Sequence, residues 1–297
     1  MEIKNILTFL RVVSLGSFTK AAVEMNYVQS TVTAQIQQLE NELGYPLFDR
    51  IGKKIFLTGG GQQFLPYANA MADQLNRITM LGKKPCDVTS ELQIGMIESL
   101  LFGVMLNILP FYKKQYPRVS LNIKLGQSVD LVELLKQNLL DLIYISAVRF
   151  NIPDLKCYYK RREYMVFLAS PNHSLAQKNQ VTLKEILCEP LTVTEHKGVV
   201  FGRLHELADN TGVPLQLACT VDSTVAISRL LQQRPGVTFL PEYSVASEIR
   251  HKQLAKLKVR DMPPQAYFTQ ILGHKNKWLS PTMEAFIQLV RRKRPER

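Results

Sequence analysis

The chain has 297 residues, of which 46% are hydrophobic and 21% charged, and its formal net charge is +12 at pH 7. This length predicts two or three domains, and the composition is typical of a folded globular protein and excludes a disordered or fibrous one. Neither a run of about 18 apolar residues nor a signal peptide is present, so we expect a cytoplasmic protein without a membrane partner.

The positive charge does not locate a nucleic-acid site. Basic proteins commonly bind nucleic acid. Residues 1–90, however, contain nine Lys and Arg against seven Asp and Glu, so most of the excess charge lies further along the chain. The functional interpretation must therefore come from the pattern of residues.

The first sixty residues show the spacing of three short helices. Apolar residues recur every three or four positions over 6–13, Gly16 interrupts them, and Ser17 can cap a second helix. A third helix is predicted over 30–43, with Gly44 placed where a left-handed residue commonly ends a helix.

The outer face of this third helix carries uncharged hydrogen-bonding side chains. An ordinary solvated helix is the alternative, although it would more usually carry Glu and Lys. Gln can pair with adenine, Ser and Thr can reach bases or phosphates, and a recognition helix enters the major groove through its amino-terminal residues. We therefore predict contacts with double-stranded DNA from Gln29, Ser30, Thr31, Thr33 and Gln37.

Residues 47–58 alternate in the manner of a short hairpin with its turn at 52–53. Such a hairpin next to a recognition helix forms a wing. Its basic side chains would contact the phosphate backbone and add affinity that does not depend on base sequence. These side chains are Arg50, Lys53 and Lys54.

From residue 7 to residue 58 the chain resembles the winged helix-turn-helix of LysR-type transcriptional regulators. The resemblance is carried by G-S-F-T-x-A-A at 16–22, L-E-x-x-L-G at 39–44 and P-L-F-x-R at 46–50. It implies a sequence-specific DNA-binding regulator. Ala34 departs from the pattern, because many relatives carry Arg there, and this predicts a different preferred DNA site.

Residues 1–58 are thus expected to form the DNA-binding domain, and 59–84 a linker helix. Apolar residues in the linker are spaced four, three, four and three apart, as in a coiled-coil seam. An amphipathic helix packed on its own chain is the alternative. The resemblance favours dimerisation through this seam, which consists of Phe64, Ala68, Met71, Leu75 and Ile78. It also implies a homodimer or a homotetramer.

Beyond residue 90, strand-like and helix-like segments alternate, which predicts an α/β fold with a mostly parallel sheet. Among these segments we expect a helix over 100–116, a strand that begins near 164 and a strand over 254–259. The resemblance implies a two-lobed effector domain over 91–297, similar to type 2 periplasmic binding proteins. One lobe would contain about 91–162 and 264–297, and the other about 163–263.

Ligands of such sheets bind beyond the carboxyl ends of strands, where helices begin. A plain helix cap is the alternative for each Ser at these turns. The resemblance implies a small-molecule effector, often an anion, in contact with Ser99, Leu100, Gln127, Ser128, Ser146, Thr194, Phe201 and Ser223. Glu195, if it faced the cleft, would repel a carboxylate.

Other classes of function have less support. The sequence contains no G-x-S-x-G, P-loop, G-x-G-x-x-G or H-E-x-x-H, and its five histidines are scattered, so we expect no enzyme, catalytic residue or metal site. A solute-binding protein would need a signal peptide. The four cysteines are expected to be buried and reduced, although a redox-sensing regulator of the same fold is an alternative. We expect no cofactor beyond a small-molecule co-inducer, and RNA polymerase as a further partner.

Overall fold

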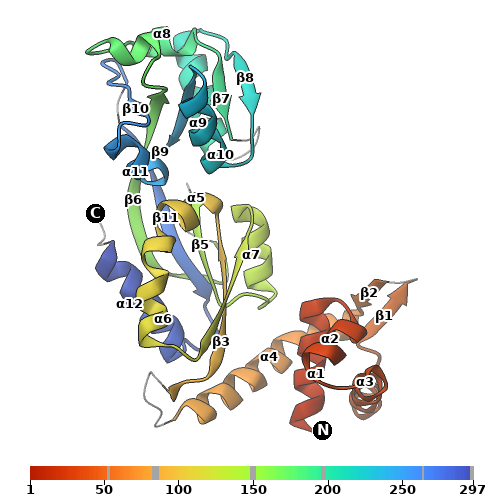
Figure 1. The fold of residues 1–297 in the computed structure, drawn as a ribbon. Coiled ribbons are helices and arrows are strands. Elements are labelled where there is room, and N and C mark those ends of the chain that lie inside the picture. Colours follow the sequence, from red (N-terminus) through yellow and green to blue (C-terminus); the bar gives the residue numbers. More distant parts are fainter. Residues whose placement is uncertain (52–53, 82–86, 148–151, 195–198, 263, 295–297) are drawn as a thin grey trace. The chain divides into compact units, whose positions relative to one another are not determined.

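The computed structural model describes residues 1–51, 54–81, 87–147, 152–194, 199–262 and 264–294. The chain forms two compact units, residues 1–84 and residues 85–297, which are described one at a time (Figure 1). No single helix in these described ranges is long and apolar enough to cross a membrane; the helices α1 (Ile3–Leu15) and α2 (Phe18–Glu24) meet that test only as a pair bent by 118°.

The first unit contains three helices, a hairpin and a long fourth helix. These are α1 (Ile3–Leu15), α2 (Phe18–Glu24), α3 (Gln29–Leu43), β1 (Phe48–Ile51), β2 (Lys54–Leu57) and α4 (Gly59–Met80). The predicted boundaries are confirmed: Gly16 ends α1 with a φ of 59°, and Gly44 ends α3 with a φ of 82°. The Ser17 side chain accepts a hydrogen bond from the backbone N–H of Lys20, which begins α2.

One hydrophobic core joins these elements. Phe9 is fully buried at its centre, and its ring centroid lies 5.3 Å from that of Phe48 in the wing and 5.2 Å from that of Phe64 in α4. The inner face of α3 contributes Val32, Ile36 and Leu39. Because the wing and the start of α4 are part of this core, the outer face of α3 is held on a rigid support.

The three glycines that open α4 allow a close approach of two backbones. Thr58 caps the helix by accepting a hydrogen bond from the N–H of Gly61 at 2.9 Å. A Cβ atom at Gly61 would lie 2.2 Å from the carbonyl oxygen of Leu47, and one at Gly60 would lie 2.5 Å from the ring of Tyr45. Positions 60 and 61 therefore carry glycine, despite its low helix propensity, because no side chain fits at either.

The second unit is built on a nine-stranded sheet with the order β4-β3-β5-β11-β6-β9-β7-β8, in which β10 also pairs with β6. The strands are β3 (Ser90–Met96), β4 (Val119–Leu125), β5 (Leu142–Ala147), β6 (Leu155–Ala169), β7 (Leu191–Val193), β8 (Leu217–Thr220), β9 (Val237–Pro241), β10 (Ala255–Lys256) and β11 (Gln265–His274). The helices are α5 (Glu98–Gly103), α6 (Leu109–Gln115), α7 (Ser128–Lys136), α8 (Leu183–Leu187), α9 (Val199–Thr211), α10 (Thr224–Gln233), α11 (Ala246–Arg250) and α12 (Pro281–Lys293).

Two lobes share this sheet. Strands β3, β4 and β5 are parallel in the first lobe, and β7, β8 and β9 are parallel in the second. The long strands β6 and β11 pair antiparallel from Leu155 opposite His274 to Met165 opposite Gln265, and they connect the lobes (Figure 1).

Three predicted elements differ from the structure. The helix expected over 100–116 is broken into α5, a short 3-10 turn and α6, because Pro110 fits only the first turn of a helix. Strand β6 begins at 155 instead of 164, since its early residues pair with β11. The strand expected near 254–259 is reduced to the two residues of β10.

Candidate DNA-reading helix and inter-lobe site

The five predicted DNA-reading residues lie on the part of α3 that faces away from the core. Gln29, Ser30 and Gln37 are exposed, and Thr31 and Thr33 are half-buried. None of the fifteen residues of α3 is Lys or Arg. The structure therefore presents a polar, cation-free helix surface to a partner, as the sequence predicts, with the exposed Ala34 in the middle of it.

Hydrogen bonds from the other helices fix the orientation of α3. Thr19 of α2 donates to Oε1 of Gln29 at 3.1 Å. Thr8 of α1 donates to Oε1 of Gln35 at 2.7 Å, and Gln35 is buried. Gln35 is thus a positioning residue, whereas Gln29 lies at the exposed amino end of the helix.

Glu40 ties α3 to the wing, a role that residue spacing alone did not predict. One of its carboxylate oxygens accepts the backbone N–H of Leu47 at 2.7 Å and that of Phe48 at 3.3 Å. These residues are the Glu of L-E-x-x-L-G and the Leu and Phe of P-L-F-x-R. The contact gives a physical reason why the two motifs occur together. The only sign of it in the sequence is that the second motif follows closely after the first.

The predicted phosphate contacts of the wing fall at the edge of what the structure describes. Arg50 in β1 and Lys54 in β2 have defined backbones, with Arg50 paired to Ile55 across the antiparallel hairpin. The side chains of both, and the whole of Lys53, lie outside the described residues. Their contacts with DNA therefore stay predictions.

The predicted dimer seam is wrong in its first half. Phe64 is only 6% exposed and Ala68 is fully buried, and both pack in the core of their own chain, so neither is accessible to a partner. The reason is that the first turns of α4 close the core beneath α1. Further along, Met71 is 39% exposed, Ile78 is 65% exposed and Leu75 is half-buried. Of the predicted seam, only the part from Met71 onward is thus accessible to a partner.

In the second unit, hydrogen bonds connect several of the predicted effector residues at the lobe junction. Ser128 donates to the carbonyl oxygen of Ser146 at 3.2 Å, which joins the start of α7 to the end of β5. Nε2 of Gln127 donates to the two carboxylate oxygens of Asp222 at 3.2 and 3.3 Å, across the lobes.

The buried Ser99 hydroxyl lies 2.9 Å from the hydroxyl of Tyr243, a contact between α5 and the 3-10 turn that follows β9. Tyr243 was not predicted from the sequence. Its proximity to Ser99 depends on a contact between residues 144 positions apart.

The remaining predicted effector residues are less well placed. Leu100 is fully buried, so its assignment as a ligand contact stays a prediction. Phe201 packs its ring 4.5 Å from that of His205 along α9, and Thr194 is half-buried just after β7. Glu195 lies outside the described residues.

Glu98 has the most extensive contacts at this junction. Its Oε1 accepts a hydrogen bond from the hydroxyl of Ser223 at 2.7 Å. Its Oε2 accepts the backbone N–H of Thr224 at 2.7 Å and the hydroxyl of Thr224 at 3.1 Å. Ser223 in turn accepts the N–H of Ala226 at 3.0 Å as the cap of α10. The amino end of a helix in one lobe therefore binds a carboxylate from the other.

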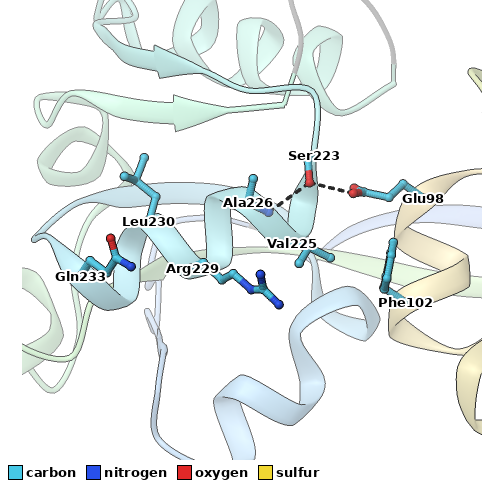
Figure 2. Close-up of a pocket in the computed structure, with 8 residues that line it drawn as sticks. All are labelled: Glu98, Phe102, Ser223, Val225, Ala226, Arg229, Leu230 and Gln233. Carbon is cyan, nitrogen blue, oxygen red and sulfur yellow. Dashed lines mark hydrogen bonds between the residues drawn. The ribbon is translucent and has the colours of Figure 1, made fainter.

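A groove of about 440 Å³ adjoins these contacts between α5 and α10 (Figure 2). Of the predicted effector residues, only Ser223 lines it. The other lining residues are Glu98, Phe102, Val225, Ala226, Arg229, Leu230 and Gln233. The groove combines an apolar wall with one acidic and one basic side chain.

A buried ion pair lies where β6, β11 and the end of α12 meet. Nη2 of Arg294 donates to Oε1 of Glu163 at 2.6 Å, and Nε of Arg161 lies 3.3 Å from the same oxygen. Burial raises the pKa of Glu163, although Arg294 and Arg161 oppose this shift.

The expectation of buried cysteines is wrong for the three that the structure describes. Cys157, Cys188 and Cys219 are exposed, and the Cys157 thiol donates to the carbonyl oxygen of Tyr159 at 3.3 Å. Cys219 is exposed because it lies on β8, the edge strand of the sheet, and Cys188 because it follows the end of α8. Cys86 lies outside the described residues.

Two family models match the sequence. Residues 3–62 match "Bacterial regulatory helix-turn-helix protein, lysR family", and residues 87–295 match "LysR substrate binding domain". The chain is 32% identical to the HTH-type transcriptional regulator YwqM of Bacillus subtilis, over 98% of this chain and 99% of that protein. It is 28% identical to the HTH-type transcriptional activator CmpR of Synechocystis, over 95% of this chain and 92% of that protein.

Solved structures share the fold. A full-length OxyR variant from Pseudomonas aeruginosa superposes with a TM-score of 0.77 at 19% identity, over 98% of this chain and 95% of that one. Full-length CbnR in complex with its target DNA has a TM-score of 0.60 at 19% identity, over 99% of this chain and 100% of that one.

The matched models and relatives are transcription regulators, and the chain is not an enzyme. The helix-turn-helix unit is thus the DNA-binding part of the molecule, and the two-lobed α/β unit is its substrate-binding domain. The chain belongs to the LysR family of DNA-binding transcriptional regulators.

Proposed function

We propose that this regulator binds its operator as a dimer through α3, and that a small molecule bound between the two lobes controls it. The observation that carries the proposal is the polar junction between the lobes, where Glu98 and Gln127 of one lobe bond to Ser223, Thr224 and Asp222 of the other. A ligand that binds one arrangement of the two lobes more tightly than another shifts the population toward it.

The dimer follows from the weak electrostatics of one DNA-binding unit. The recognition helix has no basic residue, and phosphate contacts supply much of the affinity of proteins for DNA. Two linked units double these contacts on a two-fold symmetric site. The exposed apolar side chains of α4 from Met71 onward are the surface that we propose for pairing. We further propose that dimers assemble into tetramers through the second unit, and that the DNA-bound protein contacts RNA polymerase.

The DNA-reading role is tested with Thr33→Ala in the full-length protein. If the hydroxyl reads a base, specific operator binding weakens by roughly 1–3 kcal/mol while binding to random DNA is unchanged. Thr79→Ala is the matched control, because Thr79 is an exposed threonine of α4 whose hydroxyl donates to the carbonyl oxygen of Asn76. An equal loss on operator and random DNA would show that Thr33 contacts a phosphate.

The effector role is tested by thermal-shift screening of the full chain against a metabolite library. A ligand of the cleft raises the unfolding temperature by mass action and changes the DNA footprint. Ser223→Ala should weaken this response, whereas Ser247→Ala, at an exposed serine of α11, should not. Hits that stabilise wild type and Ser223→Ala equally would place the ligand elsewhere.

A thiol-based redox regulator is the second candidate, and it is supported by the exposure of Cys188 and Cys219. Exposed thiols are accessible to peroxide, which buried thiols are not. In that case peroxide should change the DNA footprint of the wild-type protein and leave that of the variant with Ser at both positions unchanged. The same footprint with and without peroxide in the wild type excludes the switch.

A further inference from the structure

The amino end of α10 is occupied by a side chain of the opposite lobe. Thr224, its first residue, is 7% exposed, and its backbone N–H points to Glu98 at 2.7 Å. Glu98 and Thr224 are 126 residues apart in the chain. The first N–H groups of a helix have no partner within the helix and carry partial positive charge, so they bind anions. Glu98 supplies that anion here.

Figure 2 shows one of these contacts, the hydrogen bond that the Ser223 hydroxyl donates to Glu98. Both oxygens of Glu98 are used, one by the Ser223 hydroxyl and the other by the N–H and hydroxyl of Thr224. Asp222, which precedes Ser223, accepts a hydrogen bond from the side chain of Gln127 in the first lobe. We call the contact of Glu98 with Ser223 and Thr224 the Glu98 bridge.

We propose that the Glu98 bridge closes the two lobes in place of an effector, and that an acidic effector can reach the amino end of α10 only by displacing Glu98. This inference rests on the proposed control by a ligand between the lobes, and it adds the chemistry of the competition. The effector's carboxylate would replace the Glu98 carboxylate and accept the same hydrogen bonds. These hydrogen bonds alone therefore favour neither the effector nor Glu98.

The selectivity of the site must then come from the groove. Apolar surface beside the bridge is provided by Phe102, Val225 and Leu230. An effector with an apolar body gains binding free energy by burying that body against this surface, whereas acetate is too small to do so. Arg229 lines the same groove and offers a cationic partner to the displaced Glu98. A small apolar acid therefore fits better than a polyanion, which would retain unpaired charge next to Glu98.

The test is chemical rescue in the full-length protein. In Glu98→Ala, hydrogen exchange of the segment at the start of α10 should rise roughly tenfold to a hundredfold, because the N–H of Thr224 loses a charged acceptor. Sodium acetate at millimolar concentration should restore protection, whereas sodium chloride of equal ionic strength should not. Wild type should not respond to acetate, because Glu98 already occupies the place.

Glu133→Ala is the matched control, since Glu133 pairs with Lys136 on the exposed surface of α7. Glu98→Gln, which keeps an oxygen acceptor without the charge, should be intermediate and covers the case in which the alanine variant does not fold. Unchanged exchange in Glu98→Ala, or equal protection of wild type and variant by acetate, overturns the bridge. Neither outcome changes the result of the metabolite screen on the wild-type protein. Failure of the Glu98 bridge can therefore be distinguished from failure of the proposed control by an effector.

Discussion

Replacing Glu40 by Ala should loosen the connection between the recognition helix and the wing. The Glu40 carboxylate accepts the N–H of Leu47 at 2.7 Å and that of Phe48 at 3.3 Å, and Leu47 is fully buried. Water cannot replace the lost acceptor at a buried N–H. One strong charged bond and one weak bond together contribute about 2–3 kcal/mol to the free energy of unfolding.

For a unit of this size, each kcal/mol shifts the unfolding temperature by about 4–8 °C. The transition of residues 1–84 should therefore move down by roughly 10–20 °C in calorimetry of the full chain, with the second unit unaffected. Hydrogen exchange at Leu47 and Phe48 should rise, and operator affinity should fall because the wing no longer has a fixed position.

Glu42→Ala is the control on the same helix. Glu42 lies on the surface, where it pairs with the amino terminus at 3.0 Å and accepts from Gln38 at 3.2 Å. Surface pairs of this kind contribute little, about 0–1 kcal/mol. If Glu40→Ala and Glu42→Ala shift the transition equally, the Glu40 contact does not hold the wing. Glu40→Gln, which keeps an acceptor oxygen, should fall between them.

Three further substitutions test other contacts. Gly61→Ala should destabilise the first unit by roughly 1–3 kcal/mol in denaturant titration, because its Cβ would lie 2.2 Å from a carbonyl oxygen, whereas Gly59→Ala, with open space around it, should not. Gln270→Leu should raise the unfolding temperature of the second unit, since within the described part of the chain neither amide atom of this buried residue has a partner; a lower temperature would mean that the amide is paired. Leu75→Lys should yield a monomer by light scattering, and an intact dimer would refute pairing through α4.

Local features of the first unit could be predicted from the sequence because their causes lie within a few residues. Ser17 bonds three residues along the chain, and Gly16 and Gly44 end helices by adopting positive φ, so each signal is readable in a short window. The polar outer face of α3 follows from helical periodicity in the same way. The alternation of strands and helices after residue 90 likewise indicated the parallel parts of the sheet.

Contacts between distant segments were decided only by the tertiary structure. The spacing of Phe64 and Ala68 fits a dimer seam and an internal core equally well, and the packing of α4 against α1 selects the core. Periodicity shows which face of a helix is apolar but not what covers it.

The inter-lobe site combines features that are predictable from the sequence with a contact between distant segments that is not. Residue patterns predict serine at the strand-to-helix turns, and the resemblance to LysR-type regulators groups these serines into one site. Only the tertiary structure brought the Glu98 carboxylate to the amino end of α10, more than a hundred positions away in the chain. The physical reason is that a charged residue can bind any free N–H group within reach, and the fold alone determines which one lies there.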